Sequence, residues 1–475
     1  MMSNKMPLLE VLIKYNKENN DLFSMPGHKG GLGFERDKIG KEFLDRLGRL
    51  DITEVDPLDN LHAPCGVIKE SQELLAKYYN VNKAYFLVNG SSSGNMISIF
   101  SAFNEYDEVL VERNCHKSVY NGLIMRKLKV IYIDSVYNEE LGIIMPPDEE
   151  CIMKALNKAK NPKGIILTYP NYYGISYKLE EVLVKLKSKQ LKILIDGAHC
   201  AHYKATNKLP CDLTKYVDYM VLSAHKTLPS LTGSSYLLVN DYNKNVDFYF
   251  SCFTTTSPSY LLMASLDYAR YYMEKYGEED YDKLIDYAEI KRKEINNLNK
   301  VKIIGQEDLK KCYSIDKSRY LVILEKGYSG HKLLDYLRKN NIQCEMSFDN
   351  GIVLILSIFN LEAIERFKKA IEGLNLANIK EENKNININY GIHKKVLEPY
   401  EIMGKEGYLY DLDDAISKVA KEAIVPYPPG IPLVSPGEII CKEDIEYIKN
   451  CINQGISVIG LIIKDNKTLL KAIDM

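Results

Sequence analysis

Polar residues of several chemical types follow the apolar stretches of this sequence, each at the point where a stretch ends. A serine-rich turn, a histidine, a carboxylate and a His-Lys pair occur in that order along the chain. Together they offer donors for an anion, an imidazole, an acid and a primary amine. The segments lie at 90–95, 113–118, 171–174, 196–199 and 223–227.

Each segment taken alone has an ordinary structural explanation. The turn "NGSSSGN" at 89–95 is suited to capping a helix, Asp196 is suited to a helix N-terminus, and Lys226 would usually be solvated. The free N–H groups of a helix N-terminus also bind phosphate. Pyridoxal phosphate needs phosphate donors, an acidic partner for its ring nitrogen and a lysine for a Schiff base. The order of the segments therefore predicts a pyridoxal phosphate site with Lys226 as the nucleophile.

Helices and strands must bring these polar segments together. Six apolar stretches of strand length alternate with stretches whose apolar residues have helical spacing. This alternation predicts a mostly parallel sheet covered on both faces, in which ligands bind beyond the carboxyl ends of the strands. We therefore expect the polar segments at one edge of the sheet. The strand stretches are 84–90, 108–114, 129–135, 164–170, 192–198 and 219–225, and the helical ones are 66–79, 94–106 and 179–189.

The remaining sequence suggests further units around this large domain. A long helix at 260–275 leads out of it into a second α/β region. The polar run at 378–391 predicts a linker, and the proline-rich segment at 423–438 predicts an extended chain. We expect an N-terminal segment, a large domain, a small α/β domain and a C-terminal domain at 1–60, 61–270, 271–377 and 378–475.

Composition excludes several classes of protein. The net charge of −2 gives no basic field that would favour nucleic acid. The ten cysteines contain no CxxC pair, which fits reduced thiols in a cytoplasmic protein and predicts no metal site. No apolar run approaches the roughly 18 residues of a membrane-spanning helix, and the N-terminus is too polar for a signal peptide. We expect a cytoplasmic protein without a membrane partner.

Motifs along nearly the whole chain carry a family resemblance. They are "MPGHKGG" (25–31), "DITEVDPLDNLHAPCGVIKESQEL" (51–74), "FLVNGSSSGN" (86–95), "VERNCHKSV" (111–119), "YPNYYG" (169–174), "IDGAHCAH" (195–202), "SAHKTLPSLTGSSYL" (223–237), "TTTSPSYLLMASLDYAR" (254–270) and "VPYPPGIPLVSPGE" (425–438). The sequence resembles the ornithine/lysine/arginine decarboxylases, in particular the compact bacterial members without an N-terminal wing domain. The resemblance implies the α/β fold of fold type I (aspartate aminotransferase-like), with a mostly parallel sheet in a large domain, a smaller α/β domain and a C-terminal domain.

The resemblance also implies roles for individual residues. Lys226 would form the Schiff base, Asp196 would pair with the pyridine nitrogen, and His116 would stack on the ring. The implied reaction is decarboxylation of a basic amino acid through a quinonoid, which yields CO₂ and an amine for polyamine biosynthesis. Lys226 or His225 would protonate the α carbon. The implied cofactor-binding residues are Ser91, Ser92, His116, Asp196, His199, Ser223, His225, Lys226 and Thr255.

Two further implications concern the partner subunit and the substrate. The run Thr254–Thr256 resembles a segment that reaches a phosphate in the partner subunit, so we expect a homodimer or a larger homo-oligomer with its active site at the interface. Glu438 resembles the acid that meets the cationic end of the substrate. Two glycines depart from the family pattern, since Gly197 replaces a usual Glu and Gly233 replaces a common Gln. Ser417-Lys418 also stands where the family has a glycine-arginine pair.

Other functions stay open at this point. The same cofactor serves aminotransferases, β-eliminating lyases and aldolases, and fold alone does not separate them. A non-catalytic cofactor-binding protein is a third possibility, although Lys226, Asp196 and His116 are all present. The sequence does not choose between lysine, arginine and ornithine as the substrate.

Overall fold

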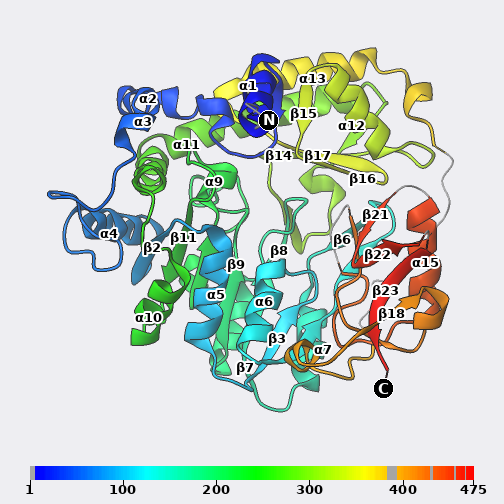
Figure 1. Ribbon diagram of the computed structural model, residues 1–475. Helices are drawn as coiled ribbons and strands as arrows, with labels where there is room; N and C mark the ends of the chain where they lie inside the picture. The colour runs from blue at the N-terminus through cyan, green and yellow to red at the C-terminus, as the bar shows by residue number, and fades with distance from the viewer. Residues whose placement is uncertain (1–5, 382–392, 428–431, 454–455, 466, 475) are drawn as a thin grey trace, which may run out of the picture.

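A computed structural model describes residues 6–381, 393–427, 432–453, 456–465 and 467–474. Figure 1 shows a large sheet with its helices, a smaller sheet beside α12 and α13, and a C-terminal region coloured orange to red. Among the described residues, no helix is both long and apolar enough to cross a membrane.

A seven-stranded sheet forms the centre of the large domain. Its strand order is β2-β11-β10-β9-β7-β3-β4. Only β11 runs antiparallel to its neighbours β10 and β2, so the expected mostly parallel sheet is confirmed. The six predicted strand stretches are all in this sheet, and β11 was not predicted. The strands are β2 (Lys83–Leu87), β3 (Glu108–Glu112), β4 (Lys129–Ile133), β7 (Pro162–Thr168), β9 (Lys192–Asp196), β10 (Tyr219–Leu222) and β11 (Ser235–Val239).

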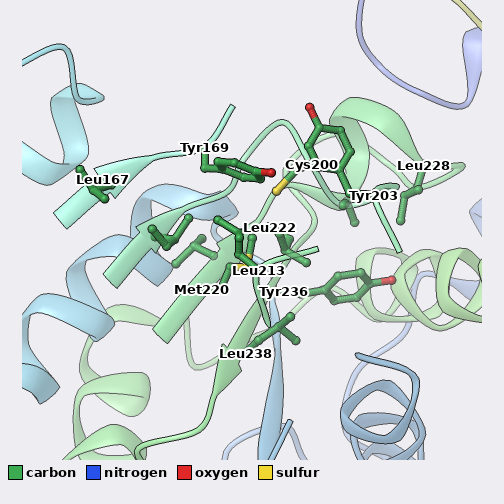
Figure 2. Packing of buried hydrophobic residues seen from close by; sticks show 14 of the residues in the cluster. Leu167, Tyr169, Cys200, Tyr203, Leu213, Met220, Leu222, Leu228, Tyr236 and Leu238 are labelled. Atoms are coloured by element: carbon green, nitrogen blue, oxygen red, sulfur yellow. The ribbon is translucent and has the colours of Figure 1, made fainter. Parts of the chain in front are cut away.

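Helices cover the sheet and bury its strands on both faces, which is why the strands read as continuous apolar runs. α5 lies especially close, because a Cβ on Gly94 would be 2.6 Å from Cδ1 of Leu87 and 2.8 Å from Cγ1 of Val221. Figure 2 shows Met220, Leu222 and other sheet residues packed together in this core. The helices are α4 (Val67–Tyr79), α5 (Gly90–Ala102), α6 (Lys117–Met125), α7 (Glu149–Lys158), α8 (Glu180–Ser188), α9 (Ala224–Thr227) and α10 (Lys244–Phe253).

The long helix α11 (Tyr260–Asn296) extends well beyond the predicted 260–275 and leads into the small domain. There an antiparallel sheet has the order β12-β14-β17-β16. A ribbon of β8 (Ile175–Tyr177) and β13 (Tyr313–Ile315) joins the large domain to the small one. The small domain contains β12 (Lys302–Ile303), β14 (Arg319–Ile323), β15 (Ile342–Cys344), β16 (Met346–Phe348), β17 (Gly351–Ile355), α12 (Gly330–Lys339) and α13 (Leu361–Gly373).

The N-terminal segment reaches the small domain, because β1 (Asp21–Phe23) pairs in parallel with β15. The N-terminal segment begins with the helix α1 (Pro7–Lys17), none of whose residues is buried within the chain. The other short elements of the first half are α2 (Lys38–Asp45), α3 (Leu47–Leu50), β5 (Val136–Asn138) and β6 (Ile143–Met145).

The C-terminal region has a hydrophobic cluster of its own, which includes Ile440, Ile448 and Leu470. The expected linker at 378–391 lies mostly outside the described residues. The proline-rich segment begins as the extended strand β20, and its residues 428–431 also lie outside the described residues. The elements are α14 (Pro399–Met403), β18 (Tyr408–Asp411), β19 (Val419–Ala420), β20 (Val425–Tyr427), α15 (Lys442–Asn453), β21 (Ser457–Ile459), β22 (Leu461–Lys464) and β23 (Lys467–Ile473).

Candidate active site

The carboxyl ends of the parallel strands bring the predicted residues to one edge of the sheet. Asp196 is the last residue of β9, and its backbone pairs with Thr168 of β7 and with Val221 of β10. The short helix α9, which carries Lys226, follows β10 directly. α5 follows β2 and α6 follows β3 at the same edge. The topology therefore places the serine turn, the imidazole, the acid and the amine on one side of the sheet.

Lys226 lies half-buried at this edge, with its Nζ atom 3.1 Å from Nε2 of His199. Burial lowers the pKa of the Lys226 amine, although the nearby charge of Asp196 opposes that shift. The pKa of His199 is lowered well below its usual value, first by burial and then by the positive charge of Lys226. Both groups are therefore shifted toward their neutral forms, as a nucleophilic amine requires.

Asp196 is a buried carboxylate that neutral groups hold in place. It accepts hydrogen bonds from Nδ2 of Asn95 (2.8 Å) and from the backbone N–H of Ala198 (3.2 Å). Asn95 also donates to Oγ of Ser118 at 2.9 Å. Asn95 was not predicted as a site residue, although it closes the serine-rich turn. Because no lysine or arginine among the described residues forms an ion pair with Asp196 within 4.0 Å, the carboxylate remains able to hold a proton on a ring nitrogen.

His116 caps the N-terminus of α6 through its own side chain. The Ser118 N–H donates to Nδ1 of His116 at 3.2 Å, so Nδ1 is the unprotonated nitrogen of the neutral ring. The Ser118 hydroxyl lies 2.8 Å from the same atom. Burial lowers the pKa of His116, and the charges of Lys226 and Lys117 add to this effect while Asp196 opposes it. Ser118 therefore links the imidazole to the Asn95–Asp196 pair.

The N-terminus of α5 has the donor set of a phosphate site. Its N-cap residue, Asn89, makes no capping hydrogen bond, because the Asn89 amide oxygen accepts from the backbone N–H of Thr255 at 3.1 Å. The first N–H groups of the helix are thus left for an anion. Ser223 donates to Ser91 across the same turn at 2.8 Å, and Ser92 is exposed in the first turn of α5.

The donor set, the acid and the amine fit pyridoxal phosphate. His225, next to Lys226, donates from Nδ1 to the carbonyl of Ser234 at 2.7 Å, which leaves Nε2 available to a ligand. Nδ1 of His199 is buried and has no hydrogen-bond partner among the described residues. A bound cofactor is one way to satisfy such a group, since an unpaired buried polar atom is costly.

Thr255 lies at the surface of the chain. Its backbone oxygen is 2.8 Å from Nε2 of His62, and its N–H is bound to Asn89 of the same chain. Its predicted contact with a phosphate in the partner subunit stays a prediction.

Glu438 is the predicted site residue that differs most from the others in its surroundings. It is fully buried, and Arg113, which directly follows β3, contacts both of its carboxylate oxygens. The backbone N–H of Ser435 donates to the same carboxylate at 2.8 Å. The expectation that Glu438 meets the substrate stays a prediction, but in this arrangement its charge is already neutralised.

The small domain contributes two residues that the motifs did not reveal. Arg319 donates from Nε to Asp316 at 3.1 Å and from Nη2 to the backbone oxygen of His199 at 3.1 Å. Glu345 accepts from the Tyr172 hydroxyl and from the Met25 N–H, and the Tyr172 ring packs edge-on against His199. No signal in the sequence marked them, because their proximity arises only from the folding of β14 and β15 back over the large domain.

Glu345 differs from Glu438 in its charge balance. It is half-buried, and no lysine or arginine among the described residues forms an ion pair with it within 4.0 Å. Its negative charge is near enough to Lys226 and Lys29 to act on the pKa of both amines. Glu345 is therefore an acid without a cationic partner beside the lysine of the site.

The two departures from the family pattern have local explanations. A Cβ on Gly197 would lie 2.8 Å from Cε of Met220 and 2.9 Å from Sγ of Cys200, so a larger residue requires these side chains to shift. Gly233 has a φ of +95°, a conformation that favours glycine. Both glycines thus suit the backbone and packing of this chain.

Comparison with known proteins supports the same assignment. A family model described as the major domain of Orn/Lys/Arg decarboxylase matches residues 6–320, and a model of the family's C-terminal domain matches residues 399–456. The arginine decarboxylase of Bacillus anthracis is 31% identical, covering 96% of this chain and 94% of that protein. The inducible lysine decarboxylase of Escherichia coli K12 is 25% identical, covering 92% of this chain and 75% of that protein.

Solved structures show the same fold. The lysine decarboxylase of Francisella novicida has a TM-score of 0.79 at 22% identity, covering 98% of this chain and 81% of that one. Together with the family models, these likenesses identify an enzyme of fold type I, a pyridoxal phosphate-dependent decarboxylase. The division into four units at the predicted boundaries stays a prediction. The chain belongs to the ornithine/lysine/arginine decarboxylase family.

Proposed function

We propose that this enzyme decarboxylates a basic amino acid, lysine, arginine or ornithine, to the corresponding amine and CO₂. The observation that carries the proposal is Lys226, an amine with a lowered pKa at the same sheet edge as Asp196. Among the described residues, no carboxylate lies within 4.0 Å of this amine. The names of the relatives, arginine decarboxylase and lysine decarboxylase, support the substrate class.

Pyridoxal phosphate, when bound, supplies an aldehyde for the substrate amine and a ring that accepts the electrons left by CO₂. In our proposal Lys226 holds the cofactor covalently, and Ser91, Ser92, Ser223 and His225 bind its phosphate with the N-terminus of α5. Asp196 keeps a proton on the ring nitrogen, which stabilises the charge that develops. His116 would pack against the ring of the cofactor. Lys226 or His225 returns a proton to the α carbon, because both are basic groups on α9.

We further propose that Glu345 meets the cationic end of the substrate. Its carboxylate has two oxygens with one neutral donor each, so both retain acceptor capacity. The carboxylate of Glu438, in contrast, is already paired with Arg113. An acid that lacks a cation and lies near the lysine of the site is the better candidate for a basic side chain.

For assembly and cellular context we retain the expectations from the sequence. We propose a homodimer or larger homo-oligomer in which Thr255 reaches the partner's cofactor, and a cytoplasmic location with a role in polyamine biosynthesis. The ten cysteines are all free in the structure, which agrees with a reducing compartment.

The decisive experiment supplies lysine, arginine and ornithine separately to enzyme loaded with pyridoxal phosphate. We expect CO₂ and one dominant amine, identified as cadaverine, agmatine or putrescine. A keto acid product would instead favour an aminotransferase. Absence of turnover on all three, with cofactor bound, would favour a non-catalytic protein.

The role of Glu345 has a separate test. Glu345→Gln should raise KM for the basic substrate about 10- to 100-fold, since a hydrogen bond to a charged group is worth about 1.5–3 kcal/mol. The visible absorbance of the bound cofactor should not change. Glu325→Gln, an exposed acid of the same domain, is the matched control. An unchanged KM in Glu345→Gln would reject this role without rejecting the decarboxylase.

A further inference from the structure

A hollow that is distinct from the Lys226 site lies where the large and small domains meet. Its volume is about 670 Å³, within the roughly 300–1,000 Å³ typical of small-molecule sites. It is lined by the end of the β8–β13 ribbon and by the loop that connects β9 with β10. Lys226, His199 and Asp196 are not among the lining residues.

The lining is strongly basic. Five lysines face two carboxylates, Glu180 and Asp212. Lys204 lies 3.6 Å from Asp212, and Lys208 lies 2.7 Å from Asp286. Lys178 and Lys317 have no carboxylate within 4.0 Å among the described residues. The lysines are Lys178, Lys204, Lys208, Lys215 and Lys317.

Tyr203 gives an independent indication of a ligand. Its side chain lines the hollow and is only 4% exposed, yet its hydroxyl has no hydrogen-bond partner among the described residues. Figure 2 shows this hydroxyl turned away from the hydrophobic cluster below it. Burial raises the pKa of Tyr203 well above its usual value, so the hydroxyl keeps its proton and can donate. A buried donor without an acceptor is costly, and a bound anion would supply the acceptor.

We propose that this hollow binds a small phosphate-bearing molecule between Lys178, Lys317 and the Tyr203 hydroxyl. Lysines act as point charges and suit phosphate, whereas planar carboxylates favour the paired donors of arginine. No arginine of the described part of the chain lines the hollow. Lys178 follows β8 and Lys317 follows β13, the two strands of the ribbon between the domains. A bound anion therefore contacts both domains at once.

Calorimetric titration of the enzyme with inorganic pyrophosphate tests the proposal. The enzyme is kept saturated with pyridoxal phosphate, so the phosphate donors at α5 are occupied. We expect one saturable site per chain in the wild type. Lys178→Ala with Lys317→Ala should weaken binding at least tenfold, and Tyr203→Phe should weaken it by a smaller factor. The control pair Lys339→Ala with Lys369→Ala removes the same charge from exposed positions on α12 and α13.

Three results would overturn the proposal. These are no pyrophosphate binding to the wild type, equal weakening in the control pair, and unchanged affinity in the Lys178/Lys317 variant. Citrate that competes as strongly as pyrophosphate would show a general anion site and reject the preference for phosphate. Decarboxylase turnover without added anion checks that each variant is folded. The outcome does not depend on which amino acid is the substrate.

Discussion

Two polar clusters near the carboxyl edge of the large sheet differ in how their buried charged groups are paired. At the junction with the C-terminal region, Arg113 is paired with Glu438, and His393 lies 2.8 Å from Asp444. In the candidate active site, Arg319 is paired with Asp316, but Lys226 has no carboxylate within 4.0 Å among the described residues. Lys226 is beside His199 instead, and burial lowers the pKa of both groups.

This difference indicates that the junction contributes mainly to stability, whereas the active-site cluster contributes mainly to chemistry. Burying a charge is costly unless a partner of opposite sign offsets the lost hydration. At the junction that offset is present: the Arg113–Glu438 pair joins the C-terminal region to the sheet, and the His393–Asp444 pair lies within that region. In the active site, the cost of burying charge instead lowers the pKa values of Lys226 and His199. Such shifts are typical of functional groups.

Lys226→Ala should have the largest effect on the site and little effect on the junction. We expect amine production to fall by more than the 10²- to 10⁴-fold typical of losing an acid–base group, since the lysine would also lose its covalent role. The visible absorbance of the lysine-bound cofactor should disappear, while the urea midpoint of the cofactor-free enzyme stays close to wild type. Lys339→Ala, which removes an exposed lysine of α12, is the control. Full turnover in Lys226→Ala would show that the Lys226 cluster does not carry the chemistry, which would contradict the comparison.

Single substitutions at the Arg113–Glu438 pair should have the largest effect on stability. Arg113→Met or Glu438→Gln leaves one buried group without its partner, and we expect a loss of about 3–5 kcal/mol in the free energy of unfolding. The double variant should lose less than the sum, because no uncompensated charge remains. Urea unfolding of the four proteins measures this coupling. If Glu438→Gln instead keeps its stability and raises KM for the amino acid, Glu438 belongs to the substrate site and not to the junction.

The sequence predicted which residues gather at one edge of the sheet far better than it predicted the contacts of the junction, for a physical reason. Lys226, Asp196, His116 and the serine turn each follow an apolar strand, and a parallel sheet brings all strand ends of one kind to one edge. Arg113 and Glu438 are 325 residues apart, and no local pattern relates them. Arg319 and Glu345 reach the site only through the folding of the small domain. The antiparallel strand β11 was missed because its residues read as part of a motif and not as a separate apolar stretch.

The pH dependence of stability should report on His393 at the junction. Burial alone would lower the pKa of His393, but the hydrogen bond and charge of Asp444, with Glu438 nearby, outweigh burial and the charge of Arg113 and raise it. A raised pKa means that the folded state binds the proton more tightly. The resulting stabilisation is complete below about pH 6.5, the unfolded value, and is lost as the pH rises through the folded value.

We therefore expect the free energy of unfolding to decrease above about pH 6.5 by an amount that is absent in His393→Asn. Urea titrations of both proteins across this range provide the measurement. The neutral His116 and His199 of the active site have lowered pKa values and contribute with the opposite sign, at lower pH. An identical pH profile in His393→Asn would show that the junction does not hold a charged imidazole.

The smallest effects should come from one glycine in each cluster. Gly437 has a φ of +90°, and a Cβ there would lie 2.2 Å from the backbone oxygen of Leu397. Gly197 has no positive φ, and a Cβ there would meet only the mobile ends of side chains such as Met220 at 2.8 Å. Gly437→Ala should therefore cost about 1–3 kcal/mol through strain, and Gly197→Ala less than about 1.5 kcal/mol. If Gly197→Ala is the more destabilising of the two in urea, the active-site edge is the more tightly constrained cluster and the comparison is reversed.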